Sequence, residues 1–99
     1  MESRLQDSGH DWCMPEISRF LGIVIQMYFE HHGPPHFHAL YGEHKAKIPI
    51  SPPGLHAGRL PQRVLALVIE WASVQEQALL GGWERLCQHQ PVHRIPPLE

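Results

Sequence analysis

Hydrophobic and polar residues alternate along three stretches in the first half of the chain. Such alternation is typical of strands that have one face in a core. It predicts strands over residues 20–29, 36–41 and 45–50. The side chains expected to face the core are Ile23, Ile25, Met27, Phe29, Phe37, Ala39, Tyr41, Ala46, Ile48 and Ile50. The strands follow one another closely, which favours an antiparallel meander with one solvent-exposed face.

In the second half of the chain, hydrophobic residues recur three and four positions apart, a spacing typical of a helix. The helix should begin at Pro61, because proline is favoured at the first helical position. The pattern runs to about Gln88, either as one long helix or as two pieces that meet near Ser73. Gly81 and Gly82 mark another candidate break, since each glycine costs about 1 kcal/mol relative to alanine in a helix.

These patterns predict an α+β fold, in which a three-stranded antiparallel meander packs against one long or two short C-terminal helices. Residues 14–99 are expected to form a single domain, because 99 residues with 42% hydrophobic content are enough for one core. Residues 1–13 are polar and lack periodicity, so we expect a disordered or loosely packed extension. Three strands leave a sheet edge open, which predicts a homo-oligomer or a small protein partner.

The composition narrows the class of function. A formal net charge of −2 gives no general attraction to nucleic acid, so charge does not favour that partner. No stretch approaches the ~20 apolar residues that span a bilayer, so no membrane association is expected. The two cysteines have no metal-binding spacing and the first residues do not resemble a signal peptide. We therefore predict a cytoplasmic protein.

Residues 30–38 contain four of the nine histidines. Alternation places His36 and His38 on one face of the second predicted strand and Phe37 on the other, so both imidazoles should point outward. Glu30 and His32, on the other side of the turn, are two further candidate ligands. Imidazole and carboxylate groups suit a divalent transition metal such as zinc or nickel. The candidate metal ligands are Glu30, His32, His36 and His38.

The histidine cluster has two further interpretations. As catalytic residues, His36 and His38 would act as acid and base in metal-free RNA cleavage, because histidine exchanges protons near neutral pH. As structural residues, they would donate hydrogen bonds to carbonyl groups of the proline-rich turn. The other side chains considered are Lys45, Lys47, Arg59 and Arg63 for phosphate contacts, and Tyr28 and Tyr41 as polar groups or buried aromatics. The spacing alone does not choose between these interpretations.

From residue 14 onward the chain resembles domain-of-unknown-function family 4160, a group of small bacterial and archaeal proteins. The resemblance is carried by the segments PEISRF, GIVI, PPHFH, YGE and EWA, together with Met27, Tyr28, His32, Ala46, Leu60, Pro61, Arg63, Leu79 and Trp83. It implies a genomic context similar to toxin–antitoxin pairs. Members often have two acidic residues before the first histidine, whereas this chain has Glu30 and His31. That difference implies weaker binding of hard cations such as Mg²⁺.

Two functions remain open. The first, ranked slightly ahead because the net charge is low, is a protein-binding module of a toxin–antitoxin-like pair. The second is a small metal-dependent hydrolase or nuclease that uses His32, His36 and His38. The sequence does not decide whether the chain is an enzyme.

Overall fold

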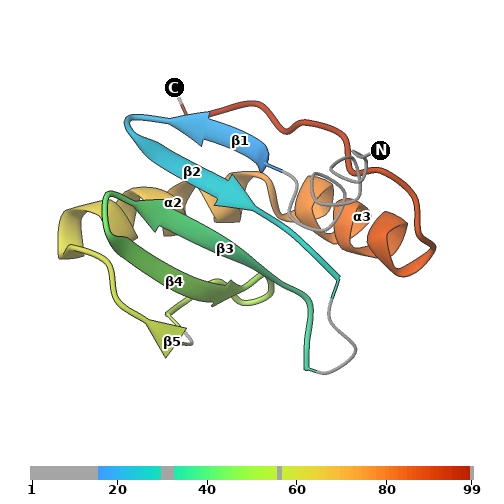
Figure 1. Ribbon diagram of the computed structural model, residues 1–99, viewed down its shortest axis with the longest axis horizontal. Helices are drawn as coiled ribbons and strands as arrows, with labels where there is room; N and C mark the ends of the chain where they lie inside the picture. The colour runs from blue at the N-terminus through green and yellow to red at the C-terminus, as the bar shows by residue number, and fades with distance from the viewer. Residues whose placement is uncertain (1–15, 30–32, 56, 99) are drawn as a thin grey trace, which may run out of the picture.

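The computed structural model describes residues 16–29, 33–55 and 57–98, so the expected extension over 1–13 lies outside the described residues. Within these described residues, five antiparallel strands form one sheet, ordered as in the chain (Figure 1). The elements are β1 (Glu16–Phe20), β2 (Ile23–Gln26), β3 (His36–Tyr41), β4 (His44–Pro49), β5 (Ala57–Gly58), α2 (Gln62–Val74) and α3 (Glu76–Cys87). The α+β class and the meander are confirmed, but the prediction of three strands is wrong.

The predicted strand over residues 20–29 corresponds to β2, and β1 was not predicted apart from its last residue, Phe20. Phe20 pairs with Ile23, so the connection is a two-residue turn in which Leu21 and Gly22 have φ of 52° and 79°. Two positive φ angles are typical of a type I′ turn, whose twist matches an antiparallel hairpin. Leucine is an unusual residue there, and the hydrophobic pattern therefore continues through the turn without a visible break.

The core face of the sheet agrees with the predicted pattern except at two positions. Phe29 lies beyond the end of β2 and is 36% exposed, so its inward orientation was predicted wrongly. Tyr41 is half-buried and packs against the edge of the core. All other side chains predicted to face inward are buried.

The strand β5 lies between the last predicted strand, which ends at residue 50, and the predicted helix, which begins at Pro61, where the sequence pattern indicates neither. Ala57 and Gly58 pair with Lys47 and Ala46 of β4. A Cβ atom at Gly58 would overlap the carbonyl oxygen of Lys45, and its φ of +89° also favours glycine. A strand of two residues has no periodicity to detect, which is why the pattern missed it.

The helical region consists of two helices that meet at Gln75, with an angle of 81° between them. The two-helix alternative is therefore confirmed, with its break two residues beyond the predicted Ser73. A break at Gly81 and Gly82 was predicted wrongly, because α3 continues through both. A Cβ at Gly82 would lie 2.9 Å from Val92, so glycine lets the C-terminal segment approach the helix.

No single helix among the described residues is long and apolar enough to cross a membrane. The bent pair of α2 and α3 reaches that length and composition only when the two helices are taken together.

Helix α2 covers one face of the sheet, and Figure 1 shows it passing behind the strands. At the centre of this contact Trp71 is 1% exposed, and its ring centroid lies 5.4 Å from that of Phe20 and 5.8 Å from that of Phe37. The indole Nε1–H of Trp71 donates a hydrogen bond to the carbonyl oxygen of Pro96 at 2.8 Å. One side chain thus joins the sheet, α2 and the C-terminal segment.

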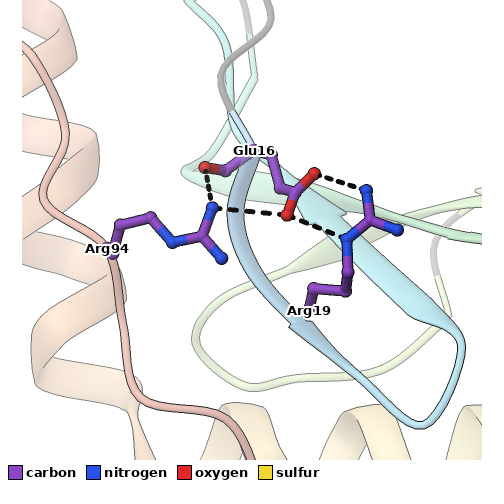
Figure 2. A network of polar contacts seen from close by, with 3 residues as sticks. All are labelled: Glu16, Arg19 and Arg94. Carbon is purple, nitrogen blue, oxygen red and sulfur yellow. Dashed lines mark hydrogen bonds and ion pairs between the residues drawn. The ribbon is translucent and has the colours of Figure 1, made fainter.

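The C-terminal segment, residues 91–98, returns to the outer edge of β1. The backbone N–H of Ile95 donates to the carbonyl oxygen of Ile17 at 2.8 Å. Arg94 Nη1 lies 3.2 Å from the carbonyl oxygen of Glu16 and 3.3 Å from its carboxylate (Figure 2). At β1, the sheet edge that was expected to be open is therefore contacted by the chain itself.

Candidate functional site

The histidine pair lies on the sheet face opposite to α2. Phe37 packs edge-on against Trp71 of α2, with centroids 5.8 Å apart. Its neighbours on β3, His36 and His38, point to the other face, where their ring centroids are 5.3 Å apart. The predicted alternation is confirmed, since consecutive strand residues face opposite sides of a sheet.

Both imidazoles are buried, at 2% exposure for His36 and 6% for His38. The prediction that they face solvent is therefore wrong. Trp83 of α3 packs against the ring of His36 with a centroid distance of 4.9 Å. The phenol ring of Tyr28 stacks on His38, 4.5 Å away and within 3° of parallel. The sequence pattern indicated which face the histidines occupy but not that two aromatic side chains cover it.

The ring of His36 is oriented by a backbone carbonyl. Its Nδ1 lies 3.1 Å from the carbonyl oxygen of Pro34. A carbonyl oxygen only accepts hydrogen bonds, so Nδ1 carries the proton and donates it. In the neutral ring Nε2 therefore holds the lone pair, and this atom is buried within the site.

His38 is oriented by Tyr28, whose hydroxyl group forms a hydrogen bond with Nε2 at 3.2 Å. The Nδ1 atom on the other side of the ring is buried. Cross-strand register places Gln26 of β2 and Lys47 of β4 on either side of His38. The Oε1 atom of Gln26 is buried and has no hydrogen-bond partner among the described residues. The face thus holds a polar oxygen as well as two imidazoles.

Two lysines of β4 lie on the same face as the histidines. Lys47 is the register partner of His38, and Lys45 is that of Leu40, two residues further along the strand. The ammonium group of Lys45 lies 5.8 Å from the centroid of the Tyr28 ring, within the range of a cation–π contact. A positive charge therefore lies beside Tyr28, one of the two aromatic side chains that pack against the histidine pair.

The other side chains considered for the site lie elsewhere. The backbone of Arg59 pairs with Lys45 at the β4 edge. Arg63 belongs to α2, which covers the opposite face. The ring of Tyr41 lies beside Gly22 at the β1–β2 turn. None of these three contacts the histidine pair, whereas Trp83, which was not among the predicted site residues, does.

The metal-site prediction stays a prediction, because the structure describes only two of its four residues. Glu30 and His32 lie outside the described residues, and the described ranges contain no group of three or more His, Cys, Asp or Glu side chains arranged to hold a metal ion. The segment that carries Glu30 and His32 follows Tyr28 and precedes Pro34, each of which contacts one imidazole.

Comparison with known proteins identifies a family but no characterised relative. A family model described as "Domain of unknown function (DUF4160)" matches residues 22–84. This span includes the whole histidine site, from Gln26 to Trp83. No curated protein and no solved structure matches the chain.

Proposed function

The chain belongs to the DUF4160 family, and because that description assigns no activity, we propose a function from the site: a small hydrolase that uses a divalent transition metal, zinc or nickel. The ligand atoms among the described residues would be Nε2 of His36 and Nδ1 of His38. Glu30 and His32 would complete the set. A centroid separation of 5.3 Å is compatible with both rings binding one ion, since each Zn–N bond is about 2.0–2.1 Å long.

The observation that carries this proposal is the hydrogen bond from His36 Nδ1–H to the carbonyl oxygen of Pro34. Histidines that bind metals usually donate their other ring N–H to a carbonyl, a carboxylate or a water molecule, and this contact fixes both tautomer and ring orientation. Tyr28 holds the ring of His38 in a comparable way through Nε2. The orphaned Oε1 of Gln26 indicates that the same face is suited to a polar occupant.

The surroundings favour a negatively charged substrate. A bound divalent ion supplies a Lewis acid and lowers the pKa of a coordinated water molecule. Lys45 and Lys47 lie on the same face as the histidines, where they would attract and position a phosphodiester. Nucleic-acid hydrolysis is therefore the reaction that we assign to the site, in the cytoplasm that the sequence indicates.

Calorimetric titration of metal-free protein with Zn²⁺, Ni²⁺ and Mg²⁺ tests the proposal. We expect Zn²⁺ and Ni²⁺ to bind more tightly than Mg²⁺, because nitrogen ligands prefer them. His36→Ala and His38→Ala should each weaken Zn²⁺ binding by a factor of about 100 or more, and Tyr28→Phe by about 10 to 100, since outer contacts orient the ligands. Binding should also weaken between pH 7 and pH 5, because protons compete for imidazole nitrogen.

His44→Ala is the matched control, because His44 is exposed and begins β4 at the far end of the hairpin. His89 is less suitable as a control, because the centroid of its ring lies 5.9 Å from that of Phe29, the residue that precedes Glu30 in the sequence. Circular dichroism establishes that each variant is folded. An absence of Zn²⁺ binding, or equal binding by folded His36→Ala and the control, would leave the histidines with a purely structural role.

A second function, a protein-binding module of a toxin–antitoxin-like pair, is favoured by a separate feature. A groove of about 380 Å³ lies between α2 and the C-terminal segment. Its lining residues are Glu70, Trp71, Val74, Gln75, Pro96, Pro97 and Leu98. Val74 is 72% exposed, which is high for a branched apolar side chain beside a hollow surface. A small partner protein or a second copy of the chain would cover it.

Light scattering at several protein concentrations, alone and with a co-expressed neighbouring gene product, tests this second function. We expect a mass above that of one chain, and we expect Val74→Asp to return the protein to a monomer. Leu21→Asp serves as control, because Leu21 is 67% exposed but lies on the β1–β2 turn. If the protein is strictly monomeric both alone and with the neighbouring gene product, the protein-binding function is excluded.

A further inference from the structure

The side chains around the histidine pair form a chain of neighbouring contacts on the sheet face opposite α2. In order, its members are Lys45, Tyr28, His38, His36 and Trp83. Neighbours lie 4.5–5.8 Å apart, measured between ring centroids or from the lysine ammonium to the tyrosine centroid. Figure 1 shows α2 behind β3 and β4 and no described helix in front of them. This face therefore presents aromatic rings with a cation at one end.

The depth of the two histidines restricts the form of a nucleic-acid substrate. His36 and His38 are 2% and 6% exposed, with Trp83 packed against the first ring and Tyr28 against the second. A phosphodiester inside a duplex is held between paired and stacked nucleotides, so it does not enter a recessed site. A single strand can bend and turn its bases outward. The burial of the imidazoles therefore favours a single-stranded substrate.

Trp83 supplies a stacking surface at one end of the histidine pair. Its indole packs against His36 but is only half-buried, so part of the ring system remains at the surface. By comparison Trp71, at the centre of the core, is 1% exposed. Bases of a single strand stack on such aromatic side chains with little regard to sequence. Trp83 is thus suited to hold one unpaired base.

Lys45 supplies a positive charge at the other end. It is exposed, and its ammonium group forms no ion pair with any described residue. It lies two residues along β4 from the register partner of His38, whereas Trp83 contacts His36. A phosphate at Lys45 and a base at Trp83 would therefore lie on opposite sides of the histidine pair.

A buried acceptor beside His38 distinguishes RNA from DNA. Gln26 of β2 is the register partner of His38, and its Oε1 atom has no hydrogen-bond partner among the described residues. A buried acceptor calls for a donor, because leaving a hydrogen bond unmade is costly. The phosphates and deoxyriboses of a DNA backbone offer only acceptors, whereas the ribose 2′-hydroxyl can donate. Gln26 therefore favours RNA.

We propose that the substrate of the histidine site is single-stranded RNA, with one base stacked on Trp83, a phosphate at Lys45 and a 2′-hydroxyl that donates to Gln26. This inference rests on the proposed hydrolase, because it specifies which nucleic acid enters the same site. The phosphodiester to be cleaved lies at His36 and His38, between the two anchoring side chains.

Fluorescence anisotropy of the full chain with labelled probes tests the inference. The probes are an unstructured RNA of about ten nucleotides, the DNA of the same sequence, and the RNA paired with its complement. Each is titrated in EDTA and again with Zn²⁺, and gel electrophoresis checks that the probe is intact. Single-stranded RNA should bind about tenfold more tightly than DNA, the effect of one hydrogen bond, and at least about tenfold more tightly than the duplex.

Three substitutions test the anchoring side chains. Lys45→Gln should weaken RNA binding about fivefold and reduce its salt dependence. The matched control is Arg63→Gln, which removes the same charge from the exposed side of α2 on the opposite face and should stay within about twofold. Trp83→Leu should weaken binding about tenfold through loss of one stacked base. Gln26→Met removes the acceptor at similar volume, so RNA and DNA should then bind within about twofold of each other.

Circular dichroism checks that each variant is folded. If Trp83→Leu is not, the indole N–H resonance of Trp83 in the unmodified protein replaces it as the measurement, and it should shift when RNA is added. An unmoved resonance at saturating RNA would contradict stacking on this side chain.

The outcomes separate this inference from the metal-dependent hydrolase. Preferential binding of single-stranded RNA by a protein that does not bind Zn²⁺ would keep the RNA site and contradict the hydrolase. Zn²⁺ binding without a preference for single-stranded RNA, in EDTA and with Zn²⁺ alike, would overturn the inference alone. Equal affinity for RNA and DNA, or equal losses in folded Lys45→Gln and Arg63→Gln, would overturn it as well.

Discussion

Replacing Trp71 with alanine should lower the free energy of unfolding by about 3–5 kcal/mol, the range for removing a large buried aromatic side chain. Trp71 is 1% exposed and contacts Phe20 and Phe37 of the sheet. Its removal leaves a cavity between the sheet and α2 and also leaves the carbonyl oxygen of Pro96 without its donor. Urea unfolding followed by far-UV circular dichroism measures the loss.

Two further substitutions separate the causes of this loss. Trp71→Phe keeps most of the ring but removes the N–H donor, so it should cost about 1–3 kcal/mol. Val74→Ala on the same helix should change stability by no more than about 0.5 kcal/mol, because Val74 is exposed. A loss below about 1 kcal/mol for Trp71→Ala would contradict the central place that the structure gives this side chain.

Replacing Gly58 with alanine should destabilise the domain by about 3 kcal/mol or more. The new Cβ would overlap the carbonyl oxygen of Lys45 and would lie 2.8 Å from the Cα atom of Ala46. The φ angle of +89° adds backbone strain, which for residues other than glycine is of the order of 1–3 kcal/mol. Relief requires β5 to move away from β4, so thermal or urea unfolding should show the loss and amide exchange should locate it there.

Two other glycines distinguish strain from overlap. Gly42 has a φ of +58°, but a Cβ added there would meet no atom within 4 Å, so Gly42→Ala should cost only about 1–2 kcal/mol. Gly54 has neither a positive φ nor a close neighbour, and Gly54→Ala should be neutral or slightly stabilising. Equal losses at Gly58 and Gly42 would show that the close approach of β5 to β4 does not limit stability.

The alternation of residues along β3 predicts the orientation of the histidines in the candidate site but not their burial. His36, Phe37 and His38 are consecutive on one strand, so their opposite orientations follow from backbone geometry alone. Their burial follows from residues that are distant in the sequence or outside any strand. Trp83 reaches His36 because α3 turns by 81° from α2, and Tyr28 covers His38 because the chain leaves β2 after Gln26. No periodic pattern encodes either path.

The sequence by itself determined the α+β class, the antiparallel meander and most of the core, because periods of two and of about 3.6 residues report which side chains face a common interior. It also identified the family, whose model matches residues 22–84. Only the tertiary structure decided those features that interrupt the periodic pattern or have no period of their own. Leu21 turns where the pattern continues, β5 is too short to have a pattern, and Trp83 of α3 packs against His36 of β3. The turn at Leu21 depends on backbone angles and the other two features on contacts between separate segments, and the hydrophobic period reports neither.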